Sequence, residues 1–138
     1  MLHVLMVEDD EVDVMNMRRS VAAAKLPWLV ETAGDGDEAL ALLRSREARH
    51  GRGQRWLVLI DLNLPGMNGL DLLARIAADP ATASLPVVVM TTSRDDRDVR
   101  AAFAARACGY FVKPLVREQF IAIITAIGSY WTLSEHPT

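Results

Sequence analysis

The stretch Leu57-Val58-Leu59-Ile60-Asp61 places an acidic residue directly after four apolar ones. A short apolar run of this kind predicts a β-strand that is buried on both faces. A carboxylate inside the core would be a buried charge with no obvious partner, which is costly. Asp61 is therefore expected at the end of the strand, in a functional rather than a structural role.

Outward from this strand, short apolar runs alternate with helical patterns along the chain. Strands are expected at residues 2–7, 29–33, 56–60, 86–90 and 110–112. Helices are expected at residues 12–22, 38–43, 70–76, 95–105 and 117–130. Each parallel crossover needs a helix, so the alternation predicts an α/β domain: a five-stranded parallel sheet with helices on both faces.

Length and composition favour one globular domain. The 138 residues suffice for a single core, and 51% of them are hydrophobic. No apolar run reaches the roughly 18 residues of a membrane span, and the first residues lack the order of a signal peptide, so we expect a cytoplasmic protein. The single cysteine, Cys108, cannot form an internal disulfide, and the net charge of −3 argues against a nucleic-acid partner.

A basic stretch precedes the strand at residues 56–60. It contains Arg44, Arg46, Arg49, His50, Arg52 and Arg55, interspersed with glycine. We expect a solvated surface loop here, because an anion site is the less common meaning of such a charge run.

Polar residues follow four of the strands, and the carboxyl ends of parallel strands meet at one edge of the sheet. These residues are Glu8, Asp9, Asp10, Asp61, Thr91, Thr92 and Lys113. Crowded carboxylates are unfavourable unless a cation neutralises them, and Mg²⁺ suits a site of oxygen ligands that leaves room for a phosphate. We therefore expect Asp61 to act as a nucleophile towards phosphorus. Lys113 and the hydroxyl of Thr91 would face the charged phosphoryl oxygens.

The strand-end residues resemble the signature of the response-regulator receiver family: Glu8-Asp9, Asp61, Thr91 and Lys113-Pro114. The stretches at 61–69 and 109–114 are similar to its two best-known motifs, and the likeness covers residues 2–130. The resemblance implies a flavodoxin-like (βα)5 fold with strand order 2-1-3-4-5. Residues 1–130 would form the receiver domain and residues 131–138 a tail, with no separate output domain.

The resemblance also implies the ligands of the metal. Asp9 and Asp61 would bind Mg²⁺ directly, and Glu8 would act through a water molecule. The backbone carbonyl of Asn63 would supply a further ligand.

The same resemblance implies a switch. Thr91 would move towards a phosphoryl group on Asp61, and Tyr110 would then turn inward and reshape the neighbouring helical face. Lys113 would pair with the phosphoryl oxygens, and a cis peptide bond would precede Pro114. The chain would catalyse only its own phosphorylation and dephosphorylation, so it would not be an enzyme in the usual sense.

Finer features resemble the single-domain regulators that partner bacterial phytochromes. They are the insertion at 46–55, the stretch at 85–93 and the sequence Ser129-Tyr130-Trp131. The expected partners are a sensor histidine kinase, with a bacteriophytochrome as the candidate, and a histidine phosphotransfer protein. We also expect a homodimer through the fourth and fifth helices and the tail, where Trp131 would be buried against the partner chain.

Three other classes of protein share part of this pattern. A phosphatase or dehalogenase with an aspartyl nucleophile normally needs a second acid two residues later, where this chain has Asn63. A flavin-binding relative would need a phosphate loop rich in Ser, Thr and Gly in place of Glu8-Asp9-Asp10. A docking module that no longer accepts phosphate is the third alternative, and the intact acidic set makes it the less favoured one.

Overall fold

The computed structural model describes residues 1–113 and 116–135. Its strands are β1 (Leu2–Val7), β2 (Trp28–Ala33), β3 (Arg55–Ile60), β4 (Val87–Thr91) and β5 (Gly109–Val112). Its helices are α1 (Glu11–Ala23), α2 (Gly36–Arg44), α3 (Arg46–His50), α4 (Gly69–Ala78), α5 (Asp96–Ala104) and α6 (Arg117–Leu133). The strands are parallel in the order β2-β1-β3-β4-β5, which confirms the predicted fold class and strand order.

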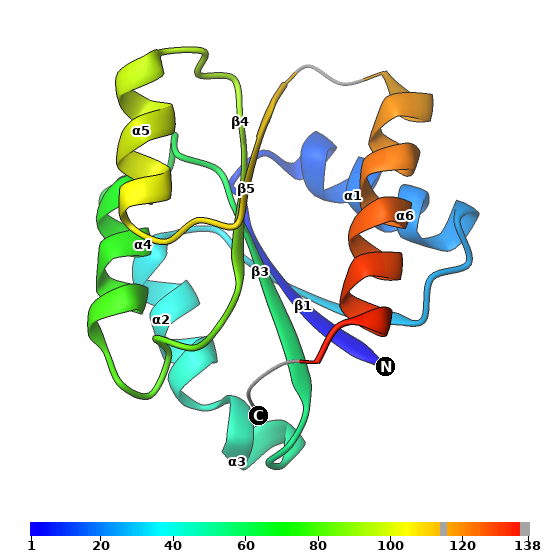
Figure 1. The fold of residues 1–138 in the computed structure, drawn as a ribbon, viewed down its shortest axis with the longest axis horizontal. Coiled ribbons are helices and arrows are strands. Elements are labelled where there is room, and N and C mark those ends of the chain that lie inside the picture. Colours follow the sequence, from blue (N-terminus) through cyan, green and yellow to red (C-terminus); the bar gives the residue numbers. More distant parts are fainter. Residues whose placement is uncertain (114–115, 136–138) are drawn as a thin grey trace.

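The sheet separates two helical layers. Helices α1 and α6 cover one face, and α2, α4 and α5 cover the other (Figure 1). Successive residues of β1 serve the two layers in turn: Leu5 and Val7 belong to the core under α2, α4 and α5, whereas Val4 and Met6 belong to the core under α1 and α6. Because both faces are covered, the strands are continuous apolar runs rather than alternating ones.

Short polar side chains at the carboxyl edge of the sheet start four of the helices. Asp10, Asp35, Asn68 and Asp95 each accept a hydrogen bond from a backbone N–H in the first turn of α1, α2, α4 and α5, respectively. Asp10, one of the acids after β1, therefore has a structural role as a helix cap. These caps fix where the chain leaves each strand, and so they help to position the residues between strand and helix.

The basic stretch is not simply a solvated loop. Residues Arg46–His50 form the short helix α3, and Arg49 lies 2.7 Å from Glu31 of β2, to which His50 also bonds. Burial alone would raise the pKa of Glu31, but the hydrogen bonds from Arg49 and His50 lower it. The guanidinium of Arg49 also donates to the carbonyl oxygen of Leu42 at 2.7 Å. The glycine-containing charge run predicts a solvated loop, yet its cations find acceptors on β2 and at the end of α2.

The last helix is longer than expected and overturns one prediction. Helix α6 ends at Leu133, so Trp131 lies inside the helix and not in a tail. Its side chain is 8% exposed and packs into its own core with Ile124 and Ile127, which lie on the same stripe of the helix. The predicted burial of Trp131 against a partner chain is therefore wrong. No described helix is long and apolar enough to cross a membrane, and residues 136–138 of the expected tail lie outside the described part.

Candidate functional site

A buried lysine joins three carboxylates at the carboxyl edge of the sheet. The Nζ atom of Lys113 is hydrogen-bonded to Glu8, lies 2.7 Å from Oδ2 of Asp13 and lies 3.1 Å from Oδ2 of Asp61. Only 13% of the Lys113 side chain, 2% of that of Glu8 and 11% of that of Asp61 is exposed. Residues from the ends of β1, β3 and β5 thus meet at one point, as the parallel sheet requires.

The charge balance of this cluster perturbs two of its groups. Burial is the main cause that raises the pKa of Glu8 to about 7; the charge of Asp61 adds to the rise, while Lys113 opposes it. Burial would lower the pKa of Lys113, but its hydrogen bonds to Asp13 and Glu8 and the charge of Asp61 outweigh this, so the lysine stays protonated. One cation thus faces three acids, and near neutral pH one of them holds a proton for part of the time.

The donor set suits a hard divalent cation. Glu8, Asp13 and Asp61 each offer a carboxylate oxygen, and these atoms lie within 4.8 Å of one another. Oxygen ligands with excess negative charge are what Mg²⁺ and related cations prefer. A cation bound here would take the place of the proton on Glu8 and would relieve the repulsion among the acids.

Asp13 is the residue that the sequence did not single out. An acid in the first turn of a helix is usually explained by the helix dipole, and nothing in its spacing from the other acids separates it from that common case. The third helical position of α1 nevertheless brings its carboxylate to Lys113. By contrast, the side chain of Asp9 is exposed and lies outside the carboxylate cluster, and its backbone N–H donates to Glu8. Its role as a direct ligand stays a prediction.

The loop after β3 holds Asp61 in a fixed turn. The backbone N–H of Asn63 donates to Oδ1 of Asp61 at 3.0 Å, which leaves Oδ2 towards Lys113. The loop returns so closely that a Cβ atom on Gly69 would lie 2.5 Å from the carbonyl oxygen of Asp61 and from Cα of Leu62. A glycine is therefore needed at the start of α4. The proposed ligand role of the Asn63 carbonyl stays a prediction.

Thr91 and Tyr110 contact the same loop between β4 and α5. The buried hydroxyl of Thr91 accepts a hydrogen bond from the side-chain amide of Asn63 at 3.4 Å, and that amide also contacts Thr92 at 3.2 Å. The hydroxyl of Tyr110 donates to the carbonyl oxygen of Ser93 at 3.0 Å. Burial is the first cause of the raised pKa of Tyr110, so the phenol stays protonated and can donate.

Ser93 connects these contacts to α5. Its hydroxyl donates to Oδ2 of Asp98 at 2.5 Å, and its backbone N–H lies 3.5 Å from Oγ1 of Thr91. The phosphoryl-binding and switch candidates Thr91 and Tyr110 are thus joined through one residue. Pro114, for which a cis peptide was expected, lies outside the described residues.

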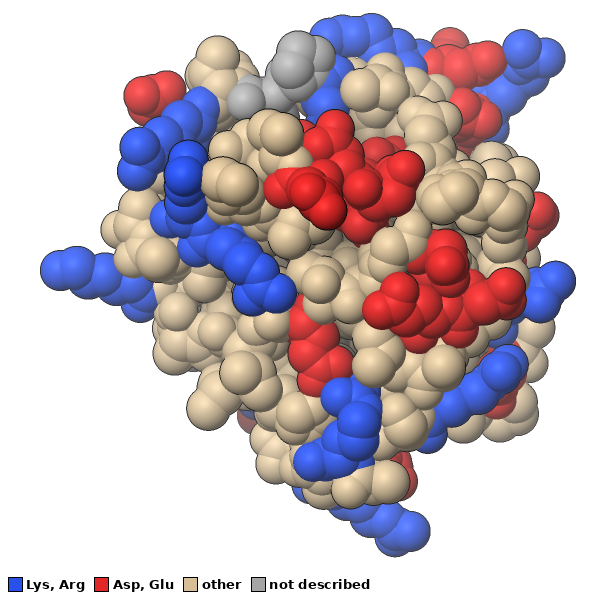
Figure 2. Space-filling model, turned by 180° about the vertical axis from the view of Figure 1, so that it is seen from behind, with Lys and Arg blue, Asp and Glu red and all other residues tan. Residues whose placement is uncertain are grey.

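The electrostatic character of the surface agrees with the net charge. Figure 2 shows acidic side chains gathered in groups on the face opposite that of Figure 1, with Lys and Arg side chains spread around them. The acidic groups occupy the middle of this face, unlike the basic face that nucleic-acid binding uses.

Comparison with known proteins gives consistent results. A family model described as the response regulator receiver domain matches residues 4–125. The probable methanogenesis regulatory protein FilR2 of Methanothrix harundinacea is 34% identical over 128 residues, which cover 93% of this chain and 82% of that protein. The crystal structure of the phosphorylated cyanobacterial phytochrome response regulator RcpA is similar with a TM-score of 0.84 and 31% identity, covering 99% of this chain and 98% of that one. The Mn²⁺-bound form of response regulator Rcp1 is similar with a TM-score of 0.82 and 28% identity, covering 99% of both chains.

Proposed function

Because this chain belongs to the response regulator receiver family, we propose that it accepts a phosphoryl group on Asp61 from a sensor histidine kinase, in a site that holds Mg²⁺. The observation that carries the proposal is the ion cluster of Lys113 with Glu8, Asp13 and Asp61. It puts a carboxylate nucleophile, a fixed cation and further oxygen ligands at one edge of the sheet.

The transfer forms one bond and breaks another. A carboxylate oxygen of Asp61 attacks the phosphorus of a phosphohistidine, the P–N bond breaks, and the imidazole leaves with the electron pair and takes up a proton. Mg²⁺ bound by Glu8, Asp61 and either Asp9 or Asp13 would neutralise the developing charge on the phosphoryl oxygens. The product is an acyl phosphate on Asp61.

Lys113 and Thr91 supply positive charge and a hydrogen-bond donor from the protein itself. Lys113 lies 3.1 Å from the Asp61 carboxylate, so a phosphoryl group bonded to Asp61 comes within reach of its ammonium group. The Thr91 hydroxyl can turn from Asn63 towards a phosphoryl oxygen. Its movement would loosen the loop through Ser93 and release Tyr110, which couples the site to the face formed by α5, β5 and α6.

We propose that the output is protein docking rather than turnover of a substrate. No acid lies two residues after Asp61, where Asn63 stands, so a general acid for repeated hydrolysis is missing there. The chain would catalyse only its own phosphorylation and dephosphorylation, in the cytoplasm. The likeness to RcpA, a phytochrome response regulator, supports a bacteriophytochrome as the kinase, and a histidine phosphotransfer protein could receive the phosphoryl group next.

We propose a homodimer through α5 and α6, which are the fourth and fifth helices that the sequence predicts, and through the last turn of α6. With Trp131 buried in its own core, support comes from exposed apolar side chains: Phe103 on α5 and Tyr130 and Leu133 on α6 are 49%, 60% and 87% exposed. Light scattering of wild type and Leu133→Glu tests this proposal. A dimer that dissociates in the variant is expected, and a monomer at all concentrations would contradict it.

Intact-mass measurement after incubation with acetyl phosphate tests the proposed chemistry. With Mg²⁺ the chain should gain the mass of one phosphoryl group, and without Mg²⁺ or in Asp61→Asn the gain should disappear. Binding of beryllofluoride, followed by NMR, detects an acceptor whose acyl phosphate is too short-lived for mass spectrometry. Absence of both signals would reject the proposal in favour of a docking module that no longer accepts phosphate.

A further inference from the structure

A cavity of about 390 Å³ lies between α1 and α6, beside the acidic site. Three apolar side chains line it, Met6 from β1, Met90 from β4 and Phe120 from α6. Its polar lining residues are Asp13, Asn16, Arg19, Ser20, Lys113 and Arg117. The volume falls within the range of small-molecule sites, which combine an apolar lining with a few polar groups.

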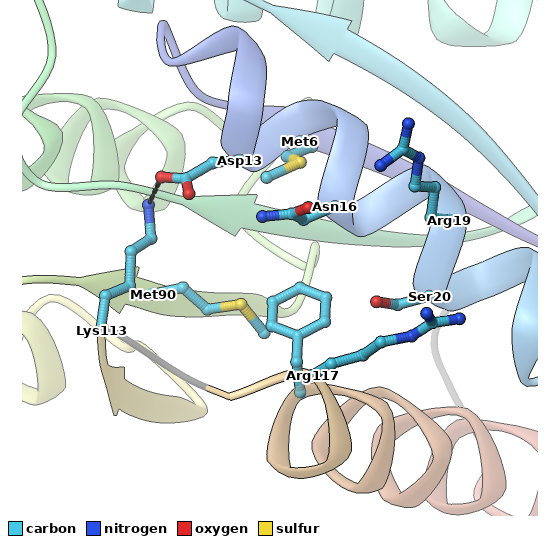
Figure 3. A pocket seen from close by; sticks show the side chains of 9 residues that line it. Met6, Asp13, Asn16, Arg19, Ser20, Met90, Lys113 and Arg117 are labelled. Carbon is cyan, nitrogen blue, oxygen red and sulfur yellow. Dashed lines mark hydrogen bonds and ion pairs between the residues drawn. The ribbon is translucent and has the colours of Figure 1, made fainter.

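The face of α1 that borders this cavity is unusually polar. Asp13, Asn16 and Ser20 are spaced by three and four residues, so they form one stripe of the helix. A helix face that packs against a neighbouring helix is normally apolar. Figure 3 shows the hydroxyl of Ser20 and the amide of Asn16 directed into the space between the two helices.

Three of these polar side chains have no hydrogen-bond partner among the described residues. Ser20 is 4% exposed, yet its hydroxyl makes no hydrogen bond with any described residue. The side chains of Asn16 and Arg117 also make none among the described residues. The Ser20 hydroxyl opens onto the cavity, so it can bond to a group that binds there.

The charges of the lining favour an anion. Lys113 closes one end of the cavity, where its charge is already opposed by Asp13 at 2.7 Å and by Glu8 and Asp61. In the view of Figure 3 the exposed side chain of Arg117 extends towards Ser20, and it forms no ion pair with a described residue. Arg19 also belongs to the lining, but its guanidinium points away from Arg117 in Figure 3, so Arg117 is the cation that this end of the cavity offers to an anion.

We propose that this cavity binds a small organic anion with an apolar body, such as an aromatic carboxylate. The apolar body would rest on Met6, Met90 and Phe120. The carboxylate would accept hydrogen bonds from Arg117 and Ser20, at the end away from Lys113. The cavity lies next to the Asp61 site, and its binding of an anion would not depend on phosphorylation of Asp61.

An NMR titration of the unphosphorylated, metal-free protein with 1-naphthoate tests the proposal. We expect saturable shifts of amide signals that are confined to α1, α6 and the adjoining ends of β1 and β4. The neutral analogue 1-naphthamide should bind about tenfold more weakly, because the charge-assisted hydrogen bonds to Arg117 are lost. Equal affinity for the acid and the amide would overturn the choice of an anion.

Variants separate the cavity from general surface charge. Arg117→Ala should weaken binding of 1-naphthoate about tenfold. The matched control Arg100→Ala, an exposed arginine on α5 outside the lining, should leave the dissociation constant unchanged within about twofold. Asn16→Trp, at an exposed position of α1, should fill the mouth and abolish the shifts. Absence of shifts in wild type, equal effects of the two arginine variants, or full binding by Asn16→Trp would each overturn the proposal.

Discussion

The raised pKa of Glu8 predicts that Mg²⁺ binding depends on pH over an unusual range. A carboxylate must lose its proton before it can bind a metal, so the proton and Mg²⁺ compete for this group. Its pKa is raised from 4.5 to about 7, chiefly by burial. With that value, about one tenth of Glu8 is ionised at pH 6 and about nine tenths at pH 8. The apparent association constant for Mg²⁺ should therefore rise about tenfold between these two pH values.

NMR titrations with MgCl₂ at pH 6, 7 and 8 and constant ionic strength measure this change. Glu8→Gln is the matched control, because it keeps the size of the side chain but cannot ionise; its single amide oxygen can keep the bond from Lys113 or those from the Asp9 and Asp10 amides, but not both. The variant should bind Mg²⁺ more weakly, and its affinity should be nearly independent of pH. A wild-type affinity that is the same at pH 6 and pH 8 within about twofold would refute the reasoning, since it would mean that Glu8 is ionised throughout.

The same shift has a consequence for stability. The folded protein binds the proton of Glu8 more tightly than the unfolded chain does, so the contribution of this group to the free energy of unfolding falls as the pH rises from about 4.5 to about 7. Mg²⁺ should restore that loss at pH 7 and above, because it binds only the folded site.

Three further predictions concern other parts of the structure. Lys113→Ala should retain Mg²⁺ binding, because the three acids lose the lysine charge that competes with the metal ion. Phosphorylation should be impaired, because the phosphoryl oxygens lose a positively charged partner. Loss of Mg²⁺ binding in NMR titrations would contradict this prediction. Gly69→Ala should lower the free energy of unfolding in urea by about 1–3 kcal/mol, whereas Gly34→Ala, where the nearest atom to an added Cβ is 3.9 Å away, should have little effect. Arg49→Ala should lower the free energy of unfolding by about 1–2 kcal/mol, because its bonds to Glu31 and to the end of α2 are lost. The control is Arg52→Ala, since the side chain of Arg52 is 90% exposed. Equal effects of the two variants would mean that α3 contributes no specific contact.

The sequence predicts the sheet well because strands covered on both faces are continuous apolar runs. The alternation of elements and the strand order agree with the structure, and Glu8, Asp61 and Lys113 meet at one edge. These positions follow from topology: wherever a parallel strand ends, its next side chain joins the same edge. Contacts of that kind need no knowledge of side-chain geometry.

The features that the sequence did not predict depend on helices rather than on strands. The role of Asp13 depends on the rotation of α1 about its axis, which its weak apolar pattern does not fix. The burial of Trp131 depends on where α6 ends, and helix ends are the least certain part of a pattern. Helix α3 is held by contacts of Arg49 and His50 with Glu31, which are far apart in the sequence. No local pattern reports such pairing.

The position of Ser93 would determine how gradually the proposed switch responds. One residue contacts Thr91 through its amide, Tyr110 through its carbonyl and Asp98 through its hydroxyl. A displacement of Thr91 that pulls on Ser93 must therefore strain the other two contacts at once, and their combined resistance opposes small movements. With only two stable arrangements of this loop, each molecule would switch completely or not at all. A graded output would then reflect the fraction of molecules that have switched.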